Sequence, residues 1–179
     1  RVGLMRTLSF NRASLKPILM LSAFSALIMV SDYYVFAPHI PQVMANYNKD
    51  SFTLVGLLFN MLYGGVIEEI MLRLFFLSLL VVMLDLLFRK SKQGLPIPTT
   101  FFYVSNGIAA VLFALGHLPA TQSAFGSLSS ILVIRSLVLN GVLGYLFGWI
   151  FIKFGIQWAM LTHALTHLFS QALLFLLIL

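Results

Sequence analysis

Three ionised side chains stand near the middle of a long apolar stretch, and they restrict what this chain can fold into. The stretch runs from Phe52 to Phe88 and contains Glu68, Glu69 and Arg73. Even on lenient insertion scales, a charged side chain at mid-membrane costs about 2.5–3.5 kcal/mol. These three charges must therefore face a protein interior and be compensated there.

The spacing of these residues separates the roles of the two carboxylates. In a helix Glu69 and Arg73 are i and i+4, with the acid on the N-terminal side, which is the favourable orientation for an ion pair. Glu68 points about 100° away from Glu69 around the same helix, so that pair does not hold it. We therefore interpret Glu69 as structural and Glu68 as available for chemistry.

The composition excludes a soluble globular domain. Of the 179 residues 60% are hydrophobic and only 9% are charged, with a mean hydropathy of +1.01, whereas soluble domains have about 25% charged residues. The net charge of +6 comes from Lys and Arg in short flanking segments. This distribution indicates membrane topology, not a nucleic-acid partner, although a basic tail is compatible with anionic lipid headgroups.

We therefore expect an all-α fold, a polytopic transmembrane bundle of about five to six membrane-embedded helices forming one integral membrane domain over residues 1–179. No internal repeat and no second domain is visible in the sequence. Cysteine is absent, which excludes disulfides, thiolate catalysis and cysteine-ligated metal. The chain begins at Arg1, so a preceding segment is left open.

The first helix is expected at about residues 17–36, an apolar run long enough to span about 30 Å of hydrocarbon. The basic segment before it, residues 1–16, contains no acid, so we expect a cytoplasmic N-terminus. Asp32, near the far end of this helix, is interpreted as the exit into a polar loop that runs to Asp50.

As one straight helix, the stretch from Phe52 to Phe88 would extend about 55 Å and overshoot the bilayer. It must therefore bend or break. Gly64-Gly65 is the natural place, either as a kink or as the junction between a short lead-in helix and a second helix that carries the glutamates.

Three further apolar runs are expected to form helices, at residues 99–118, 131–154 and 156–179. Residues 119–130 are small and hydroxylated without a charge, which predicts a short outer loop or a segment buried against protein. Gly141, Gly144 and Gly148 form a small-residue seam that favours tight helix packing. Arg135 is interpreted as a snorkelling or interfacial side chain.

Ionisable groups on three different expected helices predict a shared site. They are Glu68, His117, and the pair His163 and His167. A single membrane histidine bonded to a carbonyl or hydroxyl is compatible with a structural role. His163 and His167, however, share one helix face at i and i+4. Placing each of these groups in hydrocarbon is costly, which also argues against four unrelated structural roles.

A carboxylate and several imidazoles in a low-dielectric pocket can activate a water molecule as general base, or bind a divalent metal that does so. The metal ligands would be Glu68, His117, His163 and His167, with zinc as the candidate ion. Either arrangement gives hydrolysis, and imidazole N–H groups can donate to the oxyanion that forms.

Three short motifs carry a family resemblance. Residues 68–73 match an EExxxR motif, residues 113–117 match FxxxH, and residues 163–167 resemble HxxxN or HxxxD. In this order on hydrophobic helices, they resemble the CPBP family of intramembrane proteases, which includes CAAX-processing endopeptidases and bacteriocin-processing or immunity proteins. The resemblance covers roughly residues 52–170.

The resemblance implies an endopeptidase that cleaves a membrane-associated protein or peptide. Glu68 and His117 would activate the attacking water, and His163 with the residue four positions later would stabilise the oxyanion. Glu69 and Arg73 would support the site. Short, compact chains of this kind resemble the bacterial members of the family, which implies that this protein lies in a bacterial cell membrane.

The sequence departs from the family pattern at two positions. His167 stands where the family usually has Asn or Asp; it can still donate a hydrogen bond, but it is also a good metal ligand. Leu74 follows Arg73 where Gly is common, which concerns only the local backbone.

Other function classes remain open at this stage. A family member without activity, acting as a binding or immunity protein, would keep every motif, although intact Glu68, His117 and His163 argue against it. A small transporter or proton-relay subunit is disfavoured because no repeat is visible. Haem ligation fails because His163 and His167 share one helix face and cannot reach both sides of one haem.

The charge pattern conflicts with the motifs. Cations mark cytoplasmic ends at residues 1–16, 89–92 and 153. They require five crossings, which would put His117 near the outer leaflet and His163 roughly 10 Å from the inner one. For these two to meet, either residues 119–130 are not outside, or the last helix starts within the membrane. We give priority to the motifs.

Overall fold

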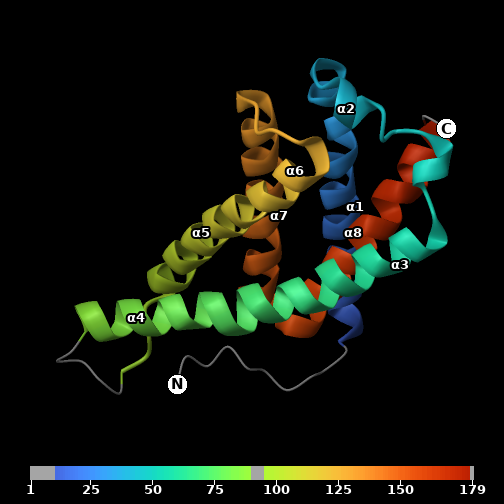
Figure 1. Ribbon diagram of the computed structural model, residues 1–179. Coiled ribbons are helices and arrows are strands. Elements are labelled where there is room, and N and C mark those ends of the chain that lie inside the picture. The colour runs from blue at the N-terminus through green and yellow to red at the C-terminus, as the bar shows by residue number, and fades with distance from the viewer. Residues whose placement is uncertain (1–10, 90–94, 178–179) are drawn as a thin grey trace.

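The computed structural model describes residues 11–89 and 95–177, and these residues form helices without any strand (Figure 1). Five helical segments are long and apolar enough to cross a membrane, namely Arg12–His39, Leu54–Phe88, Thr99–Phe125, Ser130–Phe154 and Ile156–Leu177. This confirms the expected polytopic helical bundle.

The first helix begins earlier than its hydrophobicity suggests. α1 spans Arg12–Val35, because the side chain of Asn11 caps it by accepting a hydrogen bond from the Ala13 amide at 2.9 Å. Three short turns then lead to the second membrane segment: η1 (Ala37–His39), α2 (Pro41–Met44) and η2 (Lys49–Ser51).

The second membrane segment is continuous, so the expected break at Gly64-Gly65 is absent. Its four parts are α3 (Leu54–Leu62), η3 (Tyr63–Glu68), η4 (Ile70–Leu77) and α4 (Ser78–Phe88). The winding changes from α to π at Tyr63, one residue before the glycine pair. In Figure 1 the segment runs steeply inclined to α1 and α7, so its length need not match the bilayer thickness.

Gly65 is required because the second membrane segment approaches the last helix closely at this position. A Cβ on Gly65 would lie 2.9 Å from Cβ of Ala164, 3.1 Å from the Ala164 backbone nitrogen and 3.1 Å from the carbonyl oxygen of Met160. Two of these neighbours are backbone atoms and cannot swing aside. Gly65 therefore allows the two backbones to touch.

The remaining helices are α5 (Thr99–Gly116), α6 (Leu118–Phe125), α7 (Ser130–Phe154) and α8 (Ile156–Leu177). The sequence predicts a short outer loop or a segment buried against protein at 119–130; residues 119–125 are instead helical, and none of them is buried. Pro119 lies in the first turn of α6, where its missing N–H costs nothing.

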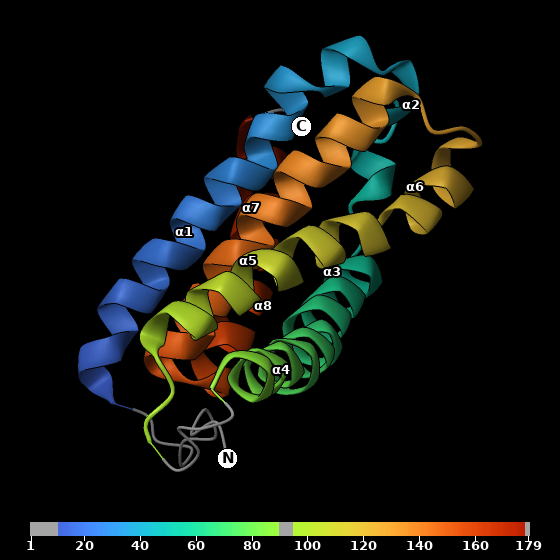
Figure 2. The ribbon, with the colours of Figure 1, turned by 90° about the vertical axis from the view of Figure 1, so that its left-hand side faces the viewer.

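Small residues pack α7 against α5, as the glycine seam predicts. A Cβ on Gly144 would lie 2.9 Å from the ring of Phe113, and one on Gly148 would overlap the side chain of Asn106. Asn106 uses the space to donate Nδ2 to the carbonyl oxygen of Tyr145 at 2.9 Å. Figure 2, which looks along α4, shows α5 lying over α7.

Arg135 and Asp32 form an ion pair that joins α7 to α1. Arg135 donates Nε to Oδ1 of Asp32 at 2.7 Å and Nη2 to Oδ2 at 2.6 Å, and Tyr47 donates its hydroxyl to Oδ2 at 2.7 Å. Asp32 lies in the last turn of α1, just before the loop, as the sequence predicts. The interpretation of Arg135 as a snorkelling or interfacial side chain does not include this partner, and the two charges neutralise each other.

Basic helix ends gather on one side of the bundle. The N-terminal end of α1 and the C-terminal ends of α4 and α7 lie along the lower edge of Figure 1, opposite the C-terminal end of α8. Among the described residues these ends carry Arg12, Lys16, Arg89 and Lys153. Arg1, Arg6, Lys90 and Lys92 lie outside the described residues. Five crossings would place these ends on one side of the membrane, as the charge pattern predicts.

Candidate active site

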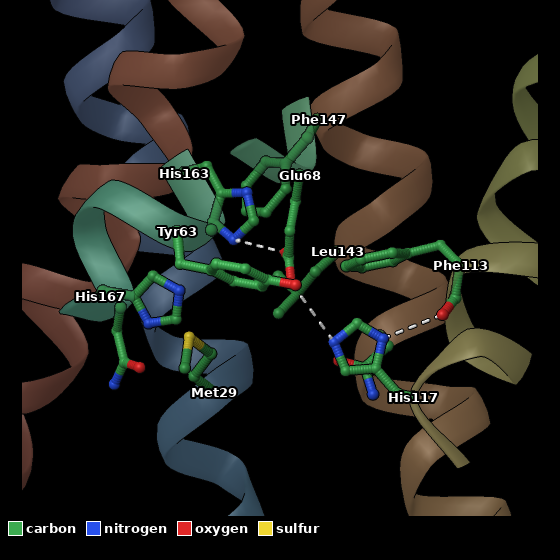
Figure 3. A pocket seen from close by; sticks show the side chains of 12 residues that line it. Met29, Tyr63, Glu68, Phe113, His117, Leu143, Phe147, His163 and His167 are labelled. Atoms are coloured by element: carbon green, nitrogen blue, oxygen red, sulfur yellow. Dashed lines mark hydrogen bonds and ion pairs between the residues drawn. The ribbon is translucent and has the colours of Figure 1, made fainter. Parts of the chain in front are cut away.

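A cavity of about 190 Å³ lies where the second membrane segment meets α1, α5, α7 and α8 (Figure 3). Four of the six residues singled out from the sequence line it: Glu68, His117, His163 and His167. The other two, Glu69 and Arg73, lie directly behind, fully buried and in contact with each other. The structure therefore brings all six together.

Glu68 stands between two histidines from different helices. Its Oε1 lies 3.8 Å from Nε2 of His117, and its Oε2 lies 3.9 Å from Nε2 of His163 (Figure 3). Both gaps are too long for a direct hydrogen bond and suit a bridging water. As the sequence predicts, the carboxylate of Glu68 is not held by the neighbouring ion pair.

Glu69 is fixed from two sides. Arg73 donates Nε to its Oε2 at 3.0 Å, which confirms the expected i, i+4 pair. The other oxygen, Oε1, lies 2.9 Å from Nδ1 of His163. Both Glu69 and Arg73 are completely buried, so the ion pair is a fixed support that orients the imidazole of His163.

Hydrogen bonding at Nδ1 sets the tautomers of the two histidines beside Glu68. Nδ1 of His117 lies 2.9 Å from the carbonyl oxygen of Phe113, and a carbonyl can only accept. His163 likewise faces an ionised carboxylate with Nδ1. In the neutral rings the proton is therefore on Nδ1, and each Nε2 presents a lone pair towards Glu68. A water molecule placed between these acceptors would supply the protons that they lack.

His167 extends the imidazole cluster along α8. Its ring stacks on that of His163, with centroids 5.2 Å apart and an angle of 22° between the planes. The other face of the cluster is closed by Phe147, which stacks on His163 at 4.3 Å. His167 thus lies at the cavity one helical turn beyond His163, where its ring can reach a bound substrate.

A bound metal ion would need several ligands at one point. Among the described residues, no group of three or more His, Cys, Asp or Glu side chains is gathered closely enough to hold a metal ion. The zinc site proposed for Glu68, His117, His163 and His167 does not fit this arrangement, and no chemical step is derived through a metal.

The structure brings His117 and His163 together despite the charge pattern. His117 is not at the end of its membrane segment, because α6 continues the segment to Phe125. The two histidines then line one cavity, and the carboxylate of Glu68 spans the remaining distance between them.

A second cavity of about 200 Å³ adjoins the first between η4 and α5. Glu68 and His117 border both cavities, and Met71, Leu112 and Gly116 line only the second. Met71 is 56% exposed and Leu112 is 41% exposed. This second cavity therefore connects Glu68 with the apolar outer surface of the bundle.

Sequence reasoning missed several residues at the site. Asn60, Asn140 and Met29 line the main cavity without having been singled out. The sequence could have indicated Asn60 and Asn140, because a polar side chain in an apolar helix requires a hydrogen-bond partner or an aqueous space. Asn140 indeed donates Nδ2 to Oγ of Ser136 at 3.2 Å.

A comparison with protein families gives a match. The family described as type II CAAX prenyl endopeptidase, Rce1-like, matches residues 50–169. No curated protein and no solved structure matches the chain. The matched region agrees with the segment of roughly 52–170 expected from the motifs, and it contains all six residues described above.

Proposed function

The chain belongs to the Rce1-like family of type II CAAX prenyl endopeptidases, and from this premise we propose that it is an intramembrane endopeptidase that hydrolyses a peptide bond of a membrane-associated protein or peptide. One observation carries the proposal. The carboxylate of Glu68, which makes no direct hydrogen bond among the described residues, lies between the Nε2 atoms of His117 and His163 in a cavity that adjoins an opening to the apolar surface.

The first step is activation of water. A water molecule bound between Glu68 and His117 loses a proton to the Glu68 carboxylate as its oxygen attacks the scissile carbonyl carbon. The second hydrogen stays on the water oxygen and donates a hydrogen bond to Nε2 of His117, which is free to accept because the ring's proton on Nδ1 is donated to the Phe113 carbonyl. Such positioned acid–base catalysis contributes about 10²- to 10⁴-fold to the rate.

The second step is stabilisation of the charge that develops on the carbonyl oxygen. His167, whose Nδ1 has no hydrogen-bond partner among the described residues, can carry its proton on Nε2 and donate a hydrogen bond from it to the oxyanion. His163 donates from Nε2 only as an imidazolium, which the Glu69 carboxylate at its Nδ1 would stabilise. The buried Glu69–Arg73 pair keeps this ring in place.

The third step returns the proton. Protonated Glu68 gives its proton to the nitrogen of the scissile bond, the carbon–nitrogen bond breaks, and a carboxylic acid and an amine leave. The opening past Met71 and Leu112 supports entry of the substrate from the apolar side, as suits an enzyme embedded in a membrane. We keep a bacterial cell membrane as the proposed location, on the family resemblance alone.

Replacing Glu68 tests the proposal. Purified protein in proteoliposomes would be incubated with a panel of fluorogenic peptides, with and without a C-terminal prenylcysteine segment. We expect Glu68→Gln to lower turnover about 10³-fold or more and to leave the melting temperature unchanged, since no direct hydrogen bond is lost. Asp50→Asn, at an exposed acid outside the cavity, is the matched control.

Two outcomes would contradict the proposal. Near-normal turnover of Glu68→Gln would remove Glu68 as the general base. Wild-type protein that cleaves nothing in the panel yet retains peptides on the vesicles would instead favour the inactive binding or immunity protein.

A further inference from the structure

Gly64 lies directly beneath the imidazole pair of α8. A Cβ built on Gly64 would lie 2.9 Å from Nε2 of His163 and 2.9 Å from Nε2 of His167. Both nitrogens therefore point at the same bare stretch of backbone, although they come from a different helix. The sequence predicts either a kink or a junction between two helices at this glycine, and the helix continues through it.

This convergence has the geometry of a two-donor oxyanion site. N–H···O hydrogen bonds span about 2.7–3.2 Å, so an oxygen on the cavity side of Gly64 can lie within reach of both Nε2 atoms. Gly64 lines the same cavity as Glu68, one helical turn away. The oxyanion and the attacking water would then lie side by side over one helix.

The clash that a methyl group would cause at Gly64 is local. The atoms in the way are ring nitrogens and a ring carbon at the ends of two side chains, with no backbone atom among them. The rings would have to move, and the fold would not. His163 can move only by stretching its bond to Glu69 or leaving its stack on Phe147.

We infer that Gly64 is a positioning residue of the active site, one that acts through His163 and His167 by leaving the space in which their Nε2 atoms meet the substrate oxyanion. This inference rests on the proposed function. It assigns a role in transition-state stabilisation to a residue with no side chain, and it separates Gly64 from its neighbour Gly65, which serves backbone packing.

The experiment compares three glycine-to-alanine variants of the full-length protein in proteoliposomes. Gly64→Ala is expected to lower the melting temperature less than Gly65→Ala does and to keep KM within about twofold, while kcat falls about tenfold to a hundredfold. Gly107→Ala is the matched control, because nothing lies within 4 Å of its Cβ position. Gly65→Ala is expected to lower the melting temperature, since it meets backbone atoms of α8.

The affinity for a transition-state mimic distinguishes a role in catalysis from a purely structural one. A peptide aldehyde, whose hydrate resembles the tetrahedral intermediate, should bind Gly64→Ala at least tenfold more weakly than wild type, with substrate KM unchanged. Equal aldehyde affinity, or kcat within threefold of wild type, would overturn the inference. A variant in which only KM rises, with kcat unchanged, would overturn it as well.

A second pair of variants and the activity of the wild type complete the experiment. If Gly64→Ala does not fold, Gly64→Ala/His167→Asn is compared with His167→Asn, because the shorter side chain removes one of the two contacts; equal kcat in this pair would overturn the inference. Wild-type protein without proteolysis would overturn the proposed function and this inference together. Active wild type with an equally active Gly64→Ala would overturn the inference alone.

Discussion

Nδ1 of His163 lies 2.9 Å from Oε1 of Glu69, and the two residues are 94 positions apart in the sequence. This bond joins α8 to the helix that carries Glu68. Because Arg73 neutralises Glu69 from the other side, a buried charge pair and a histidine form one fixed unit. The two adjacent glutamates therefore differ in environment, one held in this unit and one facing the cavity.

Glu69→Gln should destabilise the protein as well as inactivate it. The change leaves the Arg73 guanidinium, which is completely buried, without its counter-charge, and removing one partner of a buried ion pair costs about 3–5 kcal/mol. The measurement is thermal unfolding in detergent alongside turnover. Glu68→Gln is the internal control, and a Glu69→Gln protein as stable as Glu68→Gln would refute the structural role.

Arg135→Gln is expected to lower stability more than Asp32→Asn does. Removal of Arg135 strands a carboxylate that is 3% exposed, whereas removal of the Asp32 charge leaves a guanidinium that is 22% exposed and can reach solvent. We expect about 3 kcal/mol for Arg135→Gln, the lower end of the range for buried pairs. Denaturant unfolding of both variants gives the order, and the reverse order would contradict it.

Tyr47 remains as a hydrogen-bond donor in either variant. Burial raises its pKa, and the hydrogen bond and charge of Asp32 raise it further, so the hydroxyl keeps its proton at neutral pH. In Arg135→Gln this single donor must support the Asp32 carboxylate alone. The double variant Arg135→Gln/Tyr47→Phe should therefore be less stable than Arg135→Gln, as the same unfolding measurement would reveal.

The sequence predicts the local relations at the site well. Glu69 and Arg73 pair because they are one turn apart on a helix, and that spacing is visible in any apolar run. The histidines stand out for the same physical reason, since polar groups in hydrocarbon are costly unless they are used. Short-range geometry and the scarcity of charge therefore identify most of the candidate site.

Relations between distant segments were not predictable in this way. Asp32 and Arg135 are 103 positions apart, and each stands near the end of an apolar run, where a charge normally meets water. The helix at residues 118–125 was missed because its small, hydroxylated residues resemble a loop. Gly64 carries no side chain, so nothing in the sequence shows which groups of α8 lie above it.

Cysteines at positions 117 and 163 should be linked by a short bifunctional thiol reagent. Both native histidines lie within 4 Å of the same carboxylate, at 3.8 Å and 3.9 Å from Glu68, and the chain contains no cysteine of its own. Intact-mass measurement would detect the intramolecular adduct, with each single-cysteine variant as control. Full labelling at both sites without any cross-link would contradict the arrangement of α5 and α8.

His167→Asn separates the two possible mechanisms. In the proposed reaction His167 donates a hydrogen bond to the oxyanion, and an asparagine amide can do the same, so we expect activity within about tenfold of wild type. The alternative is a zinc-dependent reaction, in which the Nε2 atoms of the histidines would bind the ion although no such ligand group is gathered among the described residues. If zinc were bound, the variant would lose a ligand and need excess zinc for activity. The measurement is proteolysis by wild type and His167→Asn across a zinc titration after chelation. A chelator-sensitive wild type with a zinc-dependent variant would replace the glutamate-driven mechanism with a metal-dependent one.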